Sequence, residues 1–120
     1  MFLPITAKAN IYQDALRIMG VTLNTPSNPD VYLYTWQVFD KFNKGQKFNL
    51  TLDFKDRKFS CGNVKLAYAC YTPSKRLITI MGNPSTMDFY RYKFVLTHEY
   101  GHSTGITDEL EADNFARRYK

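Results

Sequence analysis

Residues 91–116 read RYKFVLTHEYGHSTGITDELEADNFA, and this stretch holds both histidines of the 120-residue chain. His98 and His102 are four residues apart, and Glu99 directly follows the first of them. On a helix, residues i and i+4 lie on one face about a turn apart, so both imidazoles can reach a single metal ion. Apolar residues with helical spacing precede the motif, at Phe89, Tyr92, Val95 and Leu96. The pattern therefore predicts a helix that presents the two histidines side by side.

The H-E-x-x-H pattern indicates a catalytic zinc ion. Zinc accepts neutral imidazole nitrogen at ~2.0–2.1 Å, and catalytic zinc sites keep one position open for water. Glu99 stands about 100° round the helix from His98, so we expect its carboxylate beside the water rather than on the metal. There it can take the proton of the water and later pass it to the leaving amine. The motif predicts one zinc ion per chain and a zinc-dependent endopeptidase with Glu99 as general base.

The third ligand is expected to be a carboxylate from residues 107–113, because the chain has no further histidine. Asp108 completes H-E-x-x-H-x-x-G-x-x-D, which resembles the metzincin signature with aspartate in place of its last histidine. Metzincins also carry a Met-turn after this motif, whereas all four methionines of this chain precede it. Asp108 is therefore kept as the alternative ligand, in a metzincin-like protease.

Glu109 is the favoured third ligand. The E-x-x-A-D pattern from Glu109 to Asp113 resembles gluzincins, in which a glutamate on a second helix binds the metal. An acid four residues later orients the first histidine there, which implies that Asp113 accepts the free N–H of His98. Asp108 is well suited to cap the last helix, with Glu111 three residues on completing a capping box. This capping role leaves Glu109 free for the metal.

A closer resemblance is to the ImmA/IrrE group of metallopeptidases. It covers the strand pattern Leu77–Ile80, the motif helix Arg91–His102, and E-x-E-A-D-x-F-A from Glu109 to Ala116, where that group commonly shows E-x-E-A-N-x-F-A. The resemblance implies an intracellular peptidase, often from phage or mobile elements, whose substrate is a regulatory protein. It also implies that the strand near Leu77–Met81, or its hairpin partner, binds substrate by strand addition.

The remaining patterns predict the other elements of an α+β domain. Helical spacing runs over Ala7–Met19 and stops at Gly20, and a second helix is expected from Asp30 to about Asn43. Alternating apolar residues predict strands at 48–54, 64–70 and 77–81, and a turn around Pro73–Lys75 joins the last two into a hairpin.

A helix from Ser85, with Asp88 completing a capping box and Pro84 just before it, carries the motif, and a last helix begins near Asp108. We therefore predict a single domain over residues 1–120. It has two N-terminal helices, a small, mostly antiparallel three-stranded sheet, the H-E-x-x-H helix and a C-terminal ligand-bearing helix.

Charge, apolar content and cysteine content limit the classes of partner and the cellular location that we expect. The net charge of +5 comes from scattered basic residues with no run longer than two, whereas nucleic-acid binders concentrate them in a stripe. No segment approaches the roughly 18 apolar residues that span a bilayer, and the N-terminus lacks signal-peptide features. Cys61 and Cys70 could pair across strands but do not make a disulfide framework. We expect a cytoplasmic protein with a protein or peptide substrate and neither a membrane nor a nucleic-acid partner.

Two other functions compete with the peptidase. A non-catalytic zinc-binding regulatory protein of a phage or mobile element would keep the site for stability. Structural zinc sites usually have four protein ligands and need no general base, so Glu99 favours an enzyme. A protease acting on DNA-bound proteins is suggested only by the net charge of +5, and proteases resembling SprT use a third histidine that this chain lacks. For the oxyanion stabiliser, the sequence offers Tyr100, Tyr119 or a strand tyrosine without choosing among them.

Overall fold

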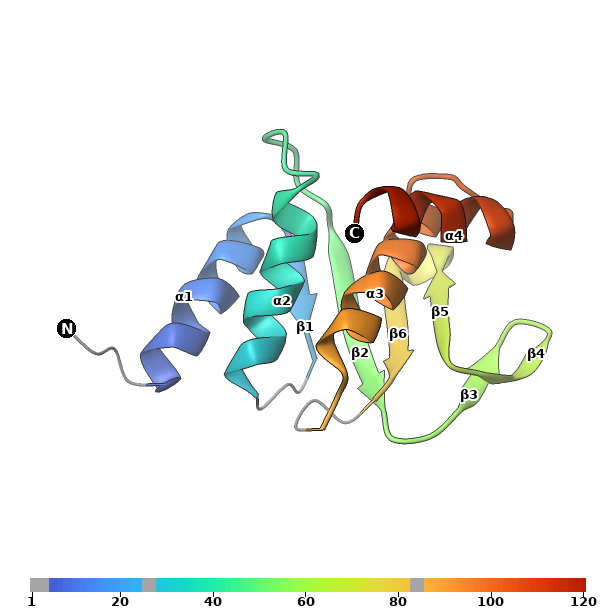
Figure 1. The fold of residues 1–120 in the computed structure, drawn as a ribbon, viewed down its shortest axis with the longest axis horizontal. Coiled ribbons are helices and arrows are strands. Elements are labelled where there is room, and N and C mark those ends of the chain that lie inside the picture. The colour runs from blue at the N-terminus through green and yellow to red at the C-terminus, as the bar shows by residue number, and fades with distance from the viewer. Residues whose placement is uncertain (1–4, 25–27, 83–85) are drawn as a thin grey trace.

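Figure 1 shows the computed structural model, which describes residues 5–24, 28–82 and 86–120. Along these residues the elements are α1 (Ile5–Ile18), β1 (Val21–Leu23), α2 (Pro29–Asp40), β2 (Leu50–Lys55), β3 (Phe59–Cys61), β4 (Val64–Ala67), β5 (Ala69–Thr72), the 3-10 turn η1 (Pro73–Lys75), β6 (Leu77–Met81), α3 (Phe89–Ser103) and α4 (Glu109–Arg118). Helices together with a mixed sheet confirm the predicted α+β class.

The main sheet has four strands in the order β1-β2-β6-β5. β1 pairs with β2 and β2 with β6 in parallel, and β5 alone runs antiparallel, beside β6. The prediction of a three-stranded, mostly antiparallel sheet is therefore wrong, although the hairpin of β5 and β6 is confirmed. The sequence did not predict β1, because a strand of three residues is too short to show an alternating pattern. The parallel pairing of β2 with β6 joins residues distant in the sequence, which local patterns do not report.

The predicted strand at 64–70 is also corrected. It divides at Tyr68 into β4 and β5, which belong to different sheets. β4 pairs antiparallel with β3, which the sequence did not predict, in a separate two-stranded sheet. A disulfide between Cys61 of β3 and Cys70 of β5 links the two sheets. The alternation of apolar residues was real, but on β4 it marks an exposed face, because Val64 and Leu66 are exposed rather than buried.

Helix starts differ from the predictions because other residues cap them. α2 begins at Pro29 rather than Asp30, since the side chain of Asn28 accepts a hydrogen bond from Asp30 N, and it ends at Asp40 rather than near Asn43. α3 begins at Phe89, where Asp88 Oδ1 accepts from Tyr90 N and Arg91 N. The predicted start of this helix, with Ser85 and Pro84, lies outside the described residues, and Asp88 takes the capping role by itself.

The turn after α1 needs a glycine. Gly20 has a φ of +79°, and a Cβ there would lie 3.0 Å from Asn49 N. The close approach brings Gly20 O within 2.9 Å of Leu50 N and Met19 O within 2.8 Å of Phe48 N. These hydrogen bonds begin the ladder between β1 and β2 and so attach the first helix to the sheet.

The three helices α1, α2 and α3 cover one face of the main sheet (Figure 1). The buried side chains between the layers include Leu16, Val31, Val38, Phe39, Leu50, Leu52, Ile78, Tyr92 and Leu96. Thr35 donates to Val31 O, so the hydroxyl of Tyr92 donates to Thr35 Oγ1 across 2.5 Å and fixes α3 to α2. Burial also raises the pKa of Tyr92 and keeps this hydroxyl protonated. The helix that carries the H-E-x-x-H motif is thus held rigidly by its core face. Within the described residues, none of the helices is long and apolar enough to cross a bilayer.

Candidate metal centre

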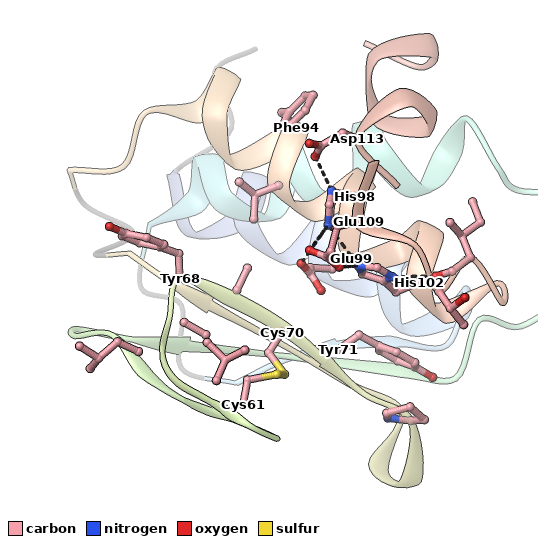
Figure 2. A pocket seen from close by; sticks show the side chains of 18 residues that line it. Cys61, Tyr68, Cys70, Tyr71, Phe94, His98, Glu99, His102, Glu109 and Asp113 are labelled. Carbon is pink, nitrogen blue, oxygen red and sulfur yellow. Dashed lines mark hydrogen bonds and ion pairs between the residues drawn. A yellow bond between two sulfur atoms is a disulfide. The ribbon is translucent and has the colours of Figure 1, made fainter. Parts of the chain in front are cut away.

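His98, Glu99 and His102 project from α3 toward β5 and the β3–β4 hairpin (Figure 2). Tyr92 and Leu96 on the same helix are fully buried in the core, and because a helix repeats every 3.6 residues, the histidines occupy a different face. Both imidazoles and the Glu99 carboxylate are mostly buried. The packing of α3 against the core therefore decides where the motif points.

The two imidazoles have the same proton arrangement. His98 Nδ1 lies 2.7 Å from Asp113 Oδ1, and His102 Nδ1 lies 2.6 Å from the main-chain oxygen of Ile106. A carboxylate and a carbonyl oxygen both accept, so each Nδ1 carries the proton and donates it. In the neutral form of each imidazole the lone pair is then on Nε2, and the two Nε2 atoms are 3.1 Å apart. Two lone pairs aimed at one point are an arrangement that a cation would stabilise.

Glu109 reaches the same point from the first residue of α4. Its Oε1 lies 2.5 Å from His102 Nε2, and its Oε2 lies 3.4 Å from His98 Nε2. The side chain is 78% exposed, so it approaches the imidazoles from the open side of the site. Of the two glutamates near the histidines, Glu109 is the nearer, because Glu99 Oε2 is 3.9 Å from His98 Nε2.

Asp108 has a different position from Glu109. It is the N-cap of α4, and its Oδ2 accepts from Glu111 N at 2.9 Å. The predicted capping role of Asp108 is therefore confirmed. Its carboxylate is occupied at the helix end, while the next residue, Glu109, turns toward the histidines.

Close packing of α4 on α3 brings Glu109 and Asp113 to the histidines. Gly101 faces Phe115, and a Cβ on Gly101 would lie 3.0 Å from the ring atom Cδ1. Ala112 is fully buried at the same contact side of α4. The ring of Phe115 also stacks on Phe42, which limits how far it can move aside. Small residues at this crossing thus allow the second helix to approach the first.

Glu99 is the most buried carboxylate of the site, with 5% of its surface exposed. The pKa of Glu99 is raised to about 6, mainly by burial. The neighbouring His98 and His102 lower this pKa, and Glu109 raises it further. A carboxylate with a pKa near neutrality both accepts and releases protons readily. Each of His98, Glu99 and His102 offers a ligand atom within 4.8 Å of the others, so this group could hold a metal ion.

A cleft of about 760 Å³ opens beside these residues. One wall comes from α3, α4 and the loop between them, and the other from β5 and the β3–β4 hairpin (Figure 2). Among the described residues, the tyrosines that line the cleft are Tyr68 and Tyr71, and the hydroxyl of Tyr71 accepts from Arg76 Nη1 at 2.9 Å. Tyr100 packs instead among Phe39, Phe42 and Phe48, and Tyr119 packs on Phe42 and Phe115. Neither of these two tyrosines lines the cleft.

The site contains features that the sequence did not reveal. The Ile106 oxygen that accepts from His102 is a main-chain atom, so no residue type indicated it. Gly101 lies inside the motif, and a helical glycine next to a motif histidine could have indicated a close helix crossing. Comparisons of the chain with protein-family models, curated proteins and solved structures found no match. Inference about function therefore depends on the site's own residues.

Proposed function

We propose that this protein is a zinc-dependent endopeptidase of the gluzincin type, related in its site to the ImmA/IrrE group. His98, His102 and Glu109 would hold one zinc ion, Glu99 would act as general base, and Asp113 would orient His98. The observation that supports this most is the convergence of the two Nε2 atoms and the Glu109 carboxylate on one point. Each Nδ1 faces an acceptor, Asp113 Oδ1 or Ile106 O, so in a neutral imidazole the Nε2 lone pair is available to a metal ion.

The donor set fits zinc better than calcium or magnesium. Calcium and magnesium prefer sites made only of oxygen, whereas two imidazoles and a carboxylate are typical of catalytic zinc. Three protein ligands leave a position for water, and a structural site would usually use four. The two cysteines are joined to each other and supply no thiolate to the site.

The residues around the ion have separate tasks. A bound zinc ion supplies Lewis-acid chemistry, lowering the pKa of water and polarising the scissile carbonyl. Glu99 accepts a proton from the attacking water and then donates it to the nitrogen of the leaving amine, so the peptide bond breaks with no net change in the protonation of Glu99. The hydrogen bond of His98 to Asp113 holds the first imidazole in its donor orientation.

β5 is the element best suited to hold an extended peptide. It is the edge strand of the main sheet and lines the cleft through Ala69, Cys70 and Tyr71, whereas β6 lies between β2 and β5. A peptide that adds to β5 would bring its backbone close to Glu99. Of the two strands considered from the sequence, the hairpin partner of Leu77–Met81 is therefore the proposed substrate strand.

The resemblance to the ImmA/IrrE group further suggests a regulatory protein as substrate and a cytoplasmic location. The Cys61–Cys70 disulfide favours an oxidising compartment instead, because disulfides persist there and are rare in the cytosol. The substrate class that is proposed is a protein with an extended, accessible segment, because an edge strand binds main chain rather than a particular folded surface.

Metal removal and return test this function. We expect purified protein to bind one equivalent of zinc and to cleave peptides in a proteome-derived mixture, detected by mass spectrometry. A chelator should reduce cleavage to background, and added zinc should restore it, since the site has no other Lewis acid among its described residues. Cleavage that continues after the zinc content has fallen to zero would contradict the proposal. Full zinc binding with no cleavage of any peptide would favour the non-catalytic zinc protein instead.

A further inference from the structure

The β3–β4 hairpin is weakly attached to the rest of the fold. It forms a sheet of its own, and its ladder shifts register between Phe59 and Cys61. A single two-stranded hairpin is marginally stable in water, so something beyond its own hydrogen bonds must hold it in place. The Cys61–Cys70 disulfide provides this, because it joins β3 to the edge strand β5 with the two Cα atoms 6.0 Å apart.

The hairpin presents apolar side chains to the proposed catalytic cleft. Val64 is 55% exposed and Leu66 is 66% exposed, yet both line the same cleft as His98 and Glu99. The half-exposed Tyr68 continues this apolar wall toward β5. Large exposed apolar groups gathered around one hollow are typical of a surface that binds another molecule. Across the cleft, Phe94 and Val95 of α3 add apolar lining near the histidines.

We propose that the β3–β4 hairpin is a substrate-binding arm, held in position by the Cys61–Cys70 disulfide. A peptide lying along β5 places one bulky apolar side chain against Val64 and Leu66, so the enzyme prefers substrates with such a residue near the scissile bond. This inference rests on the proposed peptidase function and adds a determinant of specificity to it. Its basis is that the apolar wall and the metal centre share one continuous cleft.

Opening the disulfide should release the arm. A phosphine reductant breaks the sulfur–sulfur bond and, with one water molecule, gives two cysteine thiols and the phosphine oxide. The hairpin would then stay connected through its chain ends, and the Tyr68 ring that follows β4 would still have Arg91 Cζ of α3 at 5.9 Å from its centre. Since the histidines and Glu109 are carried by α3 and α4, the metal centre should survive this change.

The test compares cleavage profiles of zinc-loaded variants in the proteome-derived peptide mixture. We expect Leu66→Ser and Val64→Ser to lower kcat/KM about tenfold for sites with a bulky apolar residue, and much less for sites without one. Ile18→Ser, which changes a 72% exposed apolar residue on α1, is the matched control and should keep the parent profile. Zinc stoichiometry and thermal unfolding are measured for each variant, so that loss of the fold is recognised.

The disulfide is tested by the double variant Cys61→Ser/Cys70→Ser and by the phosphine. Both should weaken the apolar preference by about the same factor as Leu66→Ser, with zinc still bound, and the phosphine should have no effect on the double variant. If these variants cleaved peptides at the parent rate and with the parent site preference, the proposal of a substrate arm would be wrong, while the proposed peptidase function would stand. A parent protein that cleaves nothing would overturn both proposals. A third outcome is that the parent is a dimer and that Leu66→Ser dissociates it without changing the cleavage profile. That result would show that a second copy covers this face, and the proposal of a substrate arm would again be wrong.

Discussion

Glu99→Gln is expected to bind one zinc ion with parent affinity and to cleave peptides about 10³- to 10⁴-fold more slowly. The amide has the shape of the carboxylate but cannot take a proton from water at neutral pH. Zinc affinity should change little, because Glu109 lies nearer to the imidazole nitrogens than Glu99 does. The side chain is buried, and a neutral amide fits such a place without a cost of burying charge.

The measurement combines zinc stoichiometry with single-turnover cleavage of a peptide that the parent cuts. Glu111→Gln is the matched control, because Glu111 is an exposed residue in the first turn of α4 and does not line the cleft. It should retain the parent rate. If Glu99→Gln cut at the parent rate, Glu99 would not be the general base, and the mechanism would have to be abandoned.

Glu109→Ala is expected to weaken zinc binding by more than about 100-fold. Losing a residue that merely orients a ligand costs about 10- to 100-fold in metal affinity, and a direct ligand should cost more. The expectation depends on the placement of Glu109 Oε1 and Oε2 beside the two Nε2 atoms. Competition with a fluorescent zinc indicator measures the affinity of each variant.

Asp108→Ala separates the two candidates for the third ligand. Removing this cap should cost about 1 kcal/mol of unfolding free energy, since Glu111 N loses its acceptor. Zinc affinity should stay within a few-fold of the parent value. The reverse result, with zinc lost in Asp108→Ala and kept in Glu109→Ala, would support the metzincin-like alternative.

Local patterns predicted the helices of the site well. The four-residue spacing of His98 and His102 requires nothing beyond a helix, and that helix is capped at Asp88. The choice of Glu109 over Asp108 came from similar logic, because an N-cap residue uses its side chain locally. Contacts within one helix, or between helices joined by a short loop, are few enough to be inferred from spacing.

The sheet was not predictable in the same way. The parallel pairing of Thr51–Lys55 with Leu77–Met81 is decided by packing under the helices rather than by either strand alone. The alternation at Val64 and Leu66 correctly indicated an extended chain. It also suggested that both side chains are buried, which is wrong, because a strand that lines an open cleft has the same apolar alternation as a strand in the core. The cleft itself lies between two parts of the chain that are separate in the sequence, the β3–β4 hairpin with β5 and the helices α3 with α4, and no local pattern contains that information.

X-ray absorption at the zinc edge, on protein loaded with one equivalent of zinc, tests the central claim most directly. The scattering should show two imidazole nitrogens at about 2.0–2.1 Å with oxygen ligands completing the coordination, and no sulfur. In Glu109→Ala, the imidazole contribution should remain while the oxygen contribution changes. A shell of sulfur at about 2.3 Å, or a parent protein that takes up no stoichiometric zinc, would contradict the account.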